Sequence, residues 1–225
     1  MQHGKKYRSV AEKVTIGKQY SIDEALELIQ TNRIAKFDES MEVHITLGID
    51  PKKGDEQVRG TVVLPHGTGK TKRVMVITTT KASEAKEAGA DVVGGEELIE
   101  QLKSGKFDEV DVIVATPEMM VKLAPIAKIL GPRGLMPSPK TETVTPKVQE
   151  AVTAIKKGKV NFKNDPQGGV HAVFGKTSFS SGDLKENFVA FTDALQKAKQ
   201  PAVKGKFIKS VTICSTMSPG ISLVL

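Results

Sequence analysis

Apolar and polar residues alternate strictly from residue 41 to residue 50. One set of alternate positions holds Met, Val, Ile, Leu and Ile, and the other holds Glu, His, Thr, Gly and Asp. This period of two predicts a half-buried strand of an antiparallel sheet. Upstream, Ser21-Ile-Asp-Glu24 has the form of a capping box, and the apolar residues behind it predict a helix from Ser21. A second strand is expected at residues 58–64, after a turn at 51–54.

The middle of the chain has a different pattern. Short apolar runs predict buried strands at residues 74–78, 90–93 and 110–115. Helices are predicted between and after them at residues 82–88, 96–103, 118–130 and 146–157. Strands and helices that alternate at this spacing indicate a parallel α/β layer. The last helix is expected to have Thr145 as its N-cap and Pro146 at its first position.

After Gly158 the antiparallel pattern returns. Residues 160–163 and 170–174 flank a turn signature, which predicts a hairpin, and a helix at 183–199 precedes a last strand at 207–215. Neither outer segment has enough elements for a stable layer by itself. The sequence therefore predicts two domains, one inserted in the other.

The predicted fold class is mixed, α/β and α+β. Residues 1–66 and 159–225 form a discontinuous two-layer α+β domain, and residues 67–158 form an inserted Rossmann-like three-layer α/β domain. The two chain crossings lie next to each other, and this arrangement favours a hinge.

Charge favours a polyanionic partner. The chain has 33 basic and 26 acidic residues, a net charge of +7. Its single cysteine, Cys214, excludes an intramolecular disulfide, and its four histidines are too scattered in sequence to suggest a metal cluster. No apolar run approaches the ~18 residues of a membrane span, and no signal peptide is apparent. We expect a cytoplasmic protein that uses no cofactor or metal and binds no membrane.

A nucleotide site at Gly67-Thr-Gly-Lys-Thr71 is the main enzymatic alternative. A P-loop needs glycine at the position held by Leu64, and it needs a helix directly after the lysine. Here a strand is predicted instead. Gly94-Gly95 lacks the rest of the dinucleotide fingerprint, and no Ser-His-Asp elbow is recognisable. The sequence therefore indicates a protein that is not an enzyme.

Two segments of the outer domain carry binding chemistry. Lys36, Phe37, Ser40 and Glu42 stand at the head of the alternating strand. The last strand presents hydroxyl and thiol side chains on one face, namely Ser210, Thr212, Cys214 and Thr216. Such groups at strand ends read folded RNA through its 2′-hydroxyls and phosphates. A solvated sheet face would have the same pattern, so spacing alone does not decide between the two.

Several longer motifs, in this order, carry a family resemblance over nearly the whole chain. They are Ala35-Lys-Phe-Asp-Glu39, Arg59-Gly-Thr-Val-Val-Leu-Pro-His-Gly67, Gly89-Ala-Asp-Val-Val-Gly-Gly95, Ile129-Leu-Gly-Pro-Arg-Gly-Leu-Met-Pro137, Phe162-Lys-Asn-Asp165, His171 and Gly175-Lys-Thr-Ser-Phe179. In these motifs the chain resembles the bacterial-type ribosomal protein L-one family. The resemblance implies the two-domain arrangement given above.

The resemblance also implies a function and a set of RNA-contacting residues. The function is that of a structural protein of the large ribosomal subunit, which binds ribosomal RNA at the mobile stalk as a monomer. It assists release of deacylated tRNA from the exit site and represses translation of its own messenger RNA. The implied contacts are Lys36, Phe37, Ser40, Glu42, Lys163, His171, Lys176, Ser210, Thr216, Met217 and Ser218.

Two regions leave questions for the structure. Ser218 stands where the family usually has glycine, and a positive φ there would strain the backbone at a cost of about 1 kcal/mol or more. The proline-rich loop at residues 131–140 interrupts the inserted domain. We expect this loop to brace that domain, with Arg133 as its functional residue.

Overall fold

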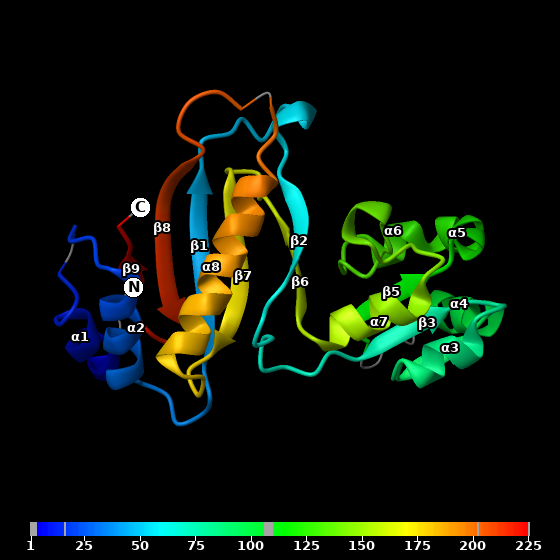
Figure 1. The fold of residues 1–225 in the computed structure, drawn as a ribbon, viewed down its shortest axis with the longest axis horizontal. Coiled ribbons are helices and arrows are strands. Elements are labelled where there is room, and N and C mark those ends of the chain that lie inside the picture. The colour runs from blue at the N-terminus through cyan, green and yellow to red at the C-terminus, as the bar shows by residue number, and fades with distance from the viewer. Residues whose placement is uncertain (1–3, 16, 106–109, 202, 225) are drawn as a thin grey trace. The chain divides into compact units, whose positions relative to one another are not determined.

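The computed structural model describes residues 4–15, 17–105, 110–201 and 203–224. Its contacts divide the chain into two compact units (Figure 1). Unit 1 comprises residues 1–69 and 160–225, and unit 2 comprises residues 70–159. Helices and strands mix in both units, and this confirms the mixed α/β class. Within the described residues, no helix is long and apolar enough to cross a membrane.

Unit 1 contains a four-stranded antiparallel sheet of order β7-β1-β8-β9 and a two-stranded sheet of β2 and β6. Its elements in chain order are α1 (Lys5–Ala11), α2 (Ile22–Thr31), β1 (Ser40–Leu47), the 3-10 turn η1 (Gly54–Glu56), β2 (Arg59–Val63), β6 (Lys159–Lys163), β7 (Gly169–Lys176), α8 (Ser181–Lys197), β8 (Ile208–Ser215) and β9 (Ile221–Ser222). The strand β1 is central, with Val43 opposite Ala172 of β7 and Ile213 of β8.

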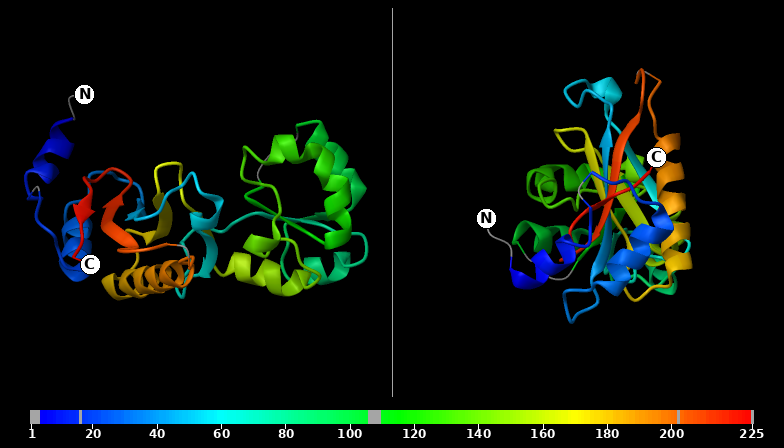
Figure 2. Two further views of the ribbon diagram at one scale, coloured as in Figure 1. Left: turned by 90° about the horizontal axis from the view of Figure 1, so that it is seen from above. Right: turned by 90° about the vertical axis from the view of Figure 1, so that its left-hand side faces the viewer.

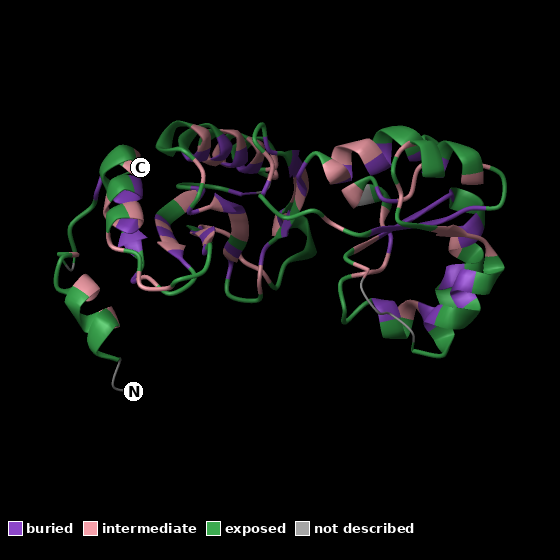
Figure 3. Cartoon of the chain, turned by 90° about the horizontal axis from the view of Figure 1, so that it is seen from below, coloured by how far each residue is buried: buried purple, intermediate pink, exposed green. Residues whose placement is uncertain are grey.

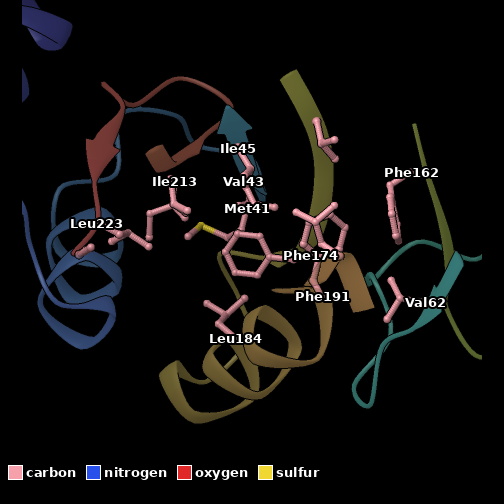
Figure 4. Close-up of a cluster of buried hydrophobic side chains, with 14 of the residues drawn as sticks. Met41, Val43, Ile45, Val62, Phe162, Phe174, Leu184, Phe191, Ile213 and Leu223 are labelled. Atoms are coloured by element: carbon pink, nitrogen blue, oxygen red, sulfur yellow. The ribbon is translucent and has the colours of Figure 1, made fainter. Parts of the chain in front are cut away.

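The core of unit 1 lies between the four-stranded sheet and the helices α2 and α8. The predicted alternation of β1 is confirmed, because Met41, Val43 and Ile45 are at most 1% exposed. Leu184 and Phe191 of α8 join Met41 in this core (Figure 4). The capping box also forms, since Ser21 Oγ accepts from Glu24 N–H and Glu24 accepts from Ser21 N–H.

The strand predicted at 58–64 forms as β2, and it pairs with β6 in the smaller sheet. One predicted strand pairing in unit 1 is wrong. The expected hairpin of 160–163 with 170–174 is reduced to one bridge, Asn164 to Val170, and its strands continue into different sheets. The side chain of Asn164 stabilises this divergence, because its Oδ1 accepts from the N–H of Val58 next to β2.

Unit 2 has a parallel three-stranded sheet of order β4-β3-β5. Its elements are β3 (Val74–Ile77), α3 (Ala82–Glu87), β4 (Val92–Gly94), α4 (Glu96–Lys103), β5 (Val112–Ala115), α5 (Pro117–Leu123), η2 (Ala124–Ile126), α6 (Ala127–Leu130), η3 (Pro139–Thr141) and α7 (Val148–Lys156). One apolar cluster joins the sheet to α4, α5 and α6, and another joins it to α3 and α7. Its strand β3 is therefore buried along its length (Figure 3).

In unit 2 two predicted helices have different bounds, and the proline-rich loop packs as expected. The helix predicted at 118–130 is broken into α5, η2 and α6, because Pro125 lacks the N–H that a continuous helix needs. The helix predicted from Pro146 begins at Val148, and Thr145 Oγ1 instead accepts from Lys147 N–H ahead of it. In the proline-rich loop, Leu135 and Met136 pack against the core of unit 2, as expected of a bracing loop.

Candidate nucleic-acid interface

The face of the four-stranded sheet opposite α2 and α8 is polar and accessible. We call it the open face; both helices lie on the other side of the sheet (Figure 2). Along β1 and β8 its side chains are partly or fully exposed, while their neighbours in sequence are buried from Met41 to Leu47 and from Val211 to Ser215. Its members include Ser40, Glu42, His44, Thr46, Ser210, Thr212, Cys214 and Thr216. The hydroxyl-rich stripe expected on the last strand is thus present.

At one end of the open face, β1, β7 and β8 bring three predicted residues together. Lys176 Nζ donates to Ser40 Oγ at 3.1 Å. The backbone N–H of Ser40 donates to Thr216 Oγ1 at 3.1 Å, and Thr216 N–H donates to Ser40 O at 3.1 Å. We call Ser40, Lys176 and Thr216 the strand-end cluster. It holds a cation and two hydroxyls in a fixed arrangement.

Two large apolar side chains are exposed beside this cluster in the chain. Phe37, three residues before β1, is 58% exposed, and Met217, two residues after β8, is 49% exposed. Lys36 next to Phe37 is also exposed. Exposed apolar side chains that border cations suit a ligand with both ring faces and phosphates.

The buried carboxylate of Glu39 connects the segments that carry these residues. Glu39 is fully buried, and its Oε1 accepts from Ala35 N–H at 3.0 Å while its Oε2 accepts from Ser215 Oγ. Its backbone pairs with Thr177. One residue thereby fixes the Lys36–Phe37 loop, the end of β8 and the turn after β7.

A second carboxylate, Asp38, braces the same turn. It accepts from Thr177 Oγ1 at 3.0 Å, from Ser178 N–H at 3.0 Å and from Ser178 Oγ at 2.9 Å. Partial burial acts to raise the pKa of Asp38, but these hydrogen bonds, chiefly from Ser178, outweigh it and leave the pKa below its usual value. Both carboxylates are therefore occupied by the protein itself.

Ser218 is accommodated without backbone strain. Within the described part of the chain, Glu142 is the one non-glycine residue with positive φ. The Ser218 hydroxyl accepts from Ser215 N–H at 2.8 Å and closes the turn after β8. Serine thus adds a hydrogen bond at the position where the family usually has glycine.

The other predicted residues are spread more widely. Glu42 lies on the open face one pleat from Ser40, His171 lies opposite His44, and Ser210 lies opposite Thr46, toward the far end of β1. Lys163 is exposed on β6 in the two-stranded sheet. The structure therefore gathers part of the predicted set at one strand end and leaves Lys163 outside that sheet.

The centre of the open face carries a chain of polar contacts that sequence reasoning missed. Cys214 Sγ lies 3.3 Å from His44 Nε2, His44 Nδ1 lies 2.8 Å from His171 Nδ1, and His171 Nε2 lies 3.3 Å from Asp165 Oδ2. We call these four residues the relay. The alternation of residues 41–50 already placed His44 on the polar face, but no local signal indicates that His171 lies opposite it.

Burial and neighbouring charges shift several pKa values in the relay. Burial, with a smaller contribution from His171, lowers the pKa of His44. Burial, aided by Glu42, raises the pKa of the Cys214 thiol to about 11. The backbone N–H of Gly169 is the largest contribution to the lowered pKa of Asp165. The free thiol is therefore protonated at neutral pH.

Residues 67–71 do not have the geometry of a phosphate-binding loop. The glycines at 67 and 69 have positive φ, and the chain then runs into β3 rather than into a helix. Lys70 Nζ instead lies 3.3 Å from Asp111 Oδ1. Residues 67–71 therefore do not form the nucleotide site that the enzymatic alternative requires.

Comparison with known proteins gives a consistent result. Residues 28–219 match the model of the ribosomal protein L1p/L10e family. The chain is 51% identical to the large ribosomal subunit protein uL1 of Mycoplasma capricolum, over 97% of both chains. It is 48% identical to the protein of that name from Solibacter usitatus, over 98% of this chain and 93% of the relative, and 50% identical to that from Cutibacterium acnes, over 99% and 96%.

Proposed function

Because the chain belongs to the ribosomal protein L1p/L10e family of structural, non-enzymatic proteins, we propose that it is a constituent of the large ribosomal subunit in the cytoplasm. It binds ribosomal RNA at the mobile stalk as a monomer and assists release of deacylated tRNA from the exit site. It also binds a similar structure on its own messenger RNA and represses translation. Full-length similarity to proteins named for that subunit supports the ribosomal part.

The single structural observation behind the RNA-binding proposal is the strand-end cluster with its exposed neighbours Phe37 and Met217. Lysine ammonium groups at Lys36 and Lys176 contact phosphates and give salt-dependent affinity. Hydroxyls contact ribose 2′-OH groups, and the Phe37 ring stacks on a base or sugar. Glu42 and Ser218 flank these contacts. Lys163, His171 and Ser210 contribute at the margin.

The two compact units have separate roles in this proposal. Residues 1–66 and 159–225 form the RNA-binding domain, and residues 67–158 form an inserted Rossmann-like domain that swings on the adjacent crossings as tRNA leaves. The proline-rich loop braces the inserted domain. This division agrees with the hydroxyl-rich stripe on the open face of unit 1 and with the exposed Phe37 and Met217 beside it in the chain.

Binding to a stalk fragment of large-subunit RNA tests the proposal. Affinity is measured over a range of salt concentrations, with an unrelated RNA hairpin of the same length for comparison. Phe37→Ala and Thr216→Ala are each expected to weaken stalk binding by about 1–3 kcal/mol. Lys36→Gln is expected to reduce the slope of log affinity against log salt by about 1.

Val189 supplies a matched control for Phe37. It is 46% exposed on α8, on the other side of the sheet, so Val189→Ala should leave RNA affinity unchanged. Equal, salt-sensitive binding to both RNAs would mean that only the net charge of +7 acts. Unchanged affinity in both Phe37→Ala and Thr216→Ala would remove the site from the open face.

A further inference from the structure

Glu42 and two residues of the relay, His44 and Cys214, place three metal-ligand atoms around one point on the open face. His44 Nε2 lies 3.3 Å from Cys214 Sγ and 3.7 Å from Glu42 Oε2, and the three ligand atoms lie within 4.8 Å of one another. A tetrahedral zinc ion with bonds of about 2.0–2.3 Å separates its ligand atoms by about 3.3–3.6 Å. The spacing of these atoms therefore already approaches that of a zinc site.

One tautomer of each histidine makes Nε2 of His44 available as a ligand. The Asp165 carboxylate accepts, so His171 Nε2 donates to it, and the His171 tautomer whose proton is on Nε2 accepts at Nδ1. His44 consequently donates from Nδ1 and directs the lone pair of Nε2 toward Cys214 and Glu42. A ligating histidine held by a hydrogen bond from its other nitrogen is a regular feature of zinc sites.

We propose that Glu42, His44 and Cys214 bind Zn²⁺ on the open face, with His171 and Asp165 as the positioning residues behind His44. Zinc is favoured over magnesium and calcium because a thiolate and an imidazole are ligands that those two cations avoid. Three protein ligands leave a fourth position for water. On binding, the sulfur–hydrogen bond of Cys214 is replaced by a sulfur–zinc bond, the proton passes to solvent, and nothing is oxidised or reduced.

This site was hidden in the sequence because its ligands come from distant segments. The four histidines are scattered along the chain, but the antiparallel register places His44 opposite His171 and Glu42 opposite Cys214. The zinc proposal requires no RNA. A test on the free protein can therefore fail without contradicting the proposed ribosomal function, and the reverse also holds.

Cobalt substitution tests the site, because the chain has one cysteine. The full-length, metal-free protein is titrated with Co²⁺ under a non-thiol reductant, and the absorption spectrum is recorded. A thiolate-to-cobalt charge-transfer band should appear, saturate at one ion per chain, and disappear when Zn²⁺ is added. Cys214→Ser should abolish the band, and His44→Gln should weaken Co²⁺ binding by at least about tenfold.

His66→Gln is the matched control, because His66 contacts the carboxylate of Glu186 but lies outside the relay. It should leave the Co²⁺ titration unchanged. His171→Gln should weaken binding by about 10–100-fold while the charge-transfer band persists, as expected of a positioning residue. Absence of the band in the folded wild-type protein, one ion per two chains, or wild-type affinity in His44→Gln would overturn the proposal.

Discussion

Replacing Glu39 tests whether the RNA-binding residues are held in place by one buried carboxylate. Glu39→Ala removes the hydrogen bonds from Ala35 N–H and Ser215 Oγ. Bonds to a charged group contribute about 1.5–3 kcal/mol each, and relief of the buried carboxylate's desolvation offsets part of the loss. We expect the free energy of unfolding of unit 1 to fall by about 2–4 kcal/mol. Glu39→Gln keeps an acceptor and the shape, so its cost should be about 1 kcal/mol.

Tyrosine fluorescence during urea unfolding measures this effect in unit 1 alone. The chain has no tryptophan, and its two tyrosines, Tyr7 and Tyr20, both lie in unit 1. RNA affinity is then measured at a urea-free condition where the variant is folded, and it should fall because the Lys36–Phe37 loop is no longer fixed. A Glu39→Ala protein within about 0.5 kcal/mol of wild type, or a Gln variant as unstable as Ala, would refute the reasoning.

Three further predictions use the same fluorescence assay. Asn187→Leu removes hydrogen bonds to His66 N–H, Gly67 O and Phe174 O, and should destabilise unit 1 by about 2–4 kcal/mol; a midpoint equal to wild type would contradict this. Ser218→Gly loses the bond from Ser215 N–H and should cost about 1 kcal/mol, whereas a gain in stability would show that serine is strained. The hydrogen bond to Glu186 is the main cause of the raised pKa of His66. Wild type should therefore be more stable than His66→Gln by a constant amount below about pH 6.5, and this advantage should disappear as pH rises through the raised pKa. An advantage that grows with pH would contradict the prediction.

Local sequence signals predicted the elements better than their partners. The capping box at Ser21 and the alternation from Met41 are properties of neighbouring residues, and both appear as expected. The pairing of β2 with β6 depends on residues a hundred positions apart, and the Asn164 side chain that stabilises it has no local signature. The helix predicted at 118–130 was too long for a different reason, because the local effect of Pro125 was overlooked.

The candidate site shows a similar division. Alternation and resemblance indicated Glu42 and Thr216, because Glu42 lies in β1 and Thr216 directly follows β8. The importance of Glu39 was missed, because an acidic residue next to a strand is normally expected to be solvated. Its burial depends on Ser215, which lies near the far end of the chain. His171 was expected at the site, but its contact with His44 required the register.

The central position of β1 has a consequence for biosynthesis. Its two partner strands begin at Gly169 and Ile208, so the ribosome adds about 120 residues after β1 before the first partner starts to emerge. At about 5–20 residues per second, β1 waits for roughly 6–25 s with both edges unpaired. The sheet of unit 2 has all its strands between residues 70 and 159 and is complete within that time. The domain that starts first is therefore the one that folds last, and the apolar face of its nascent strand β1 needs protection from aggregation meanwhile.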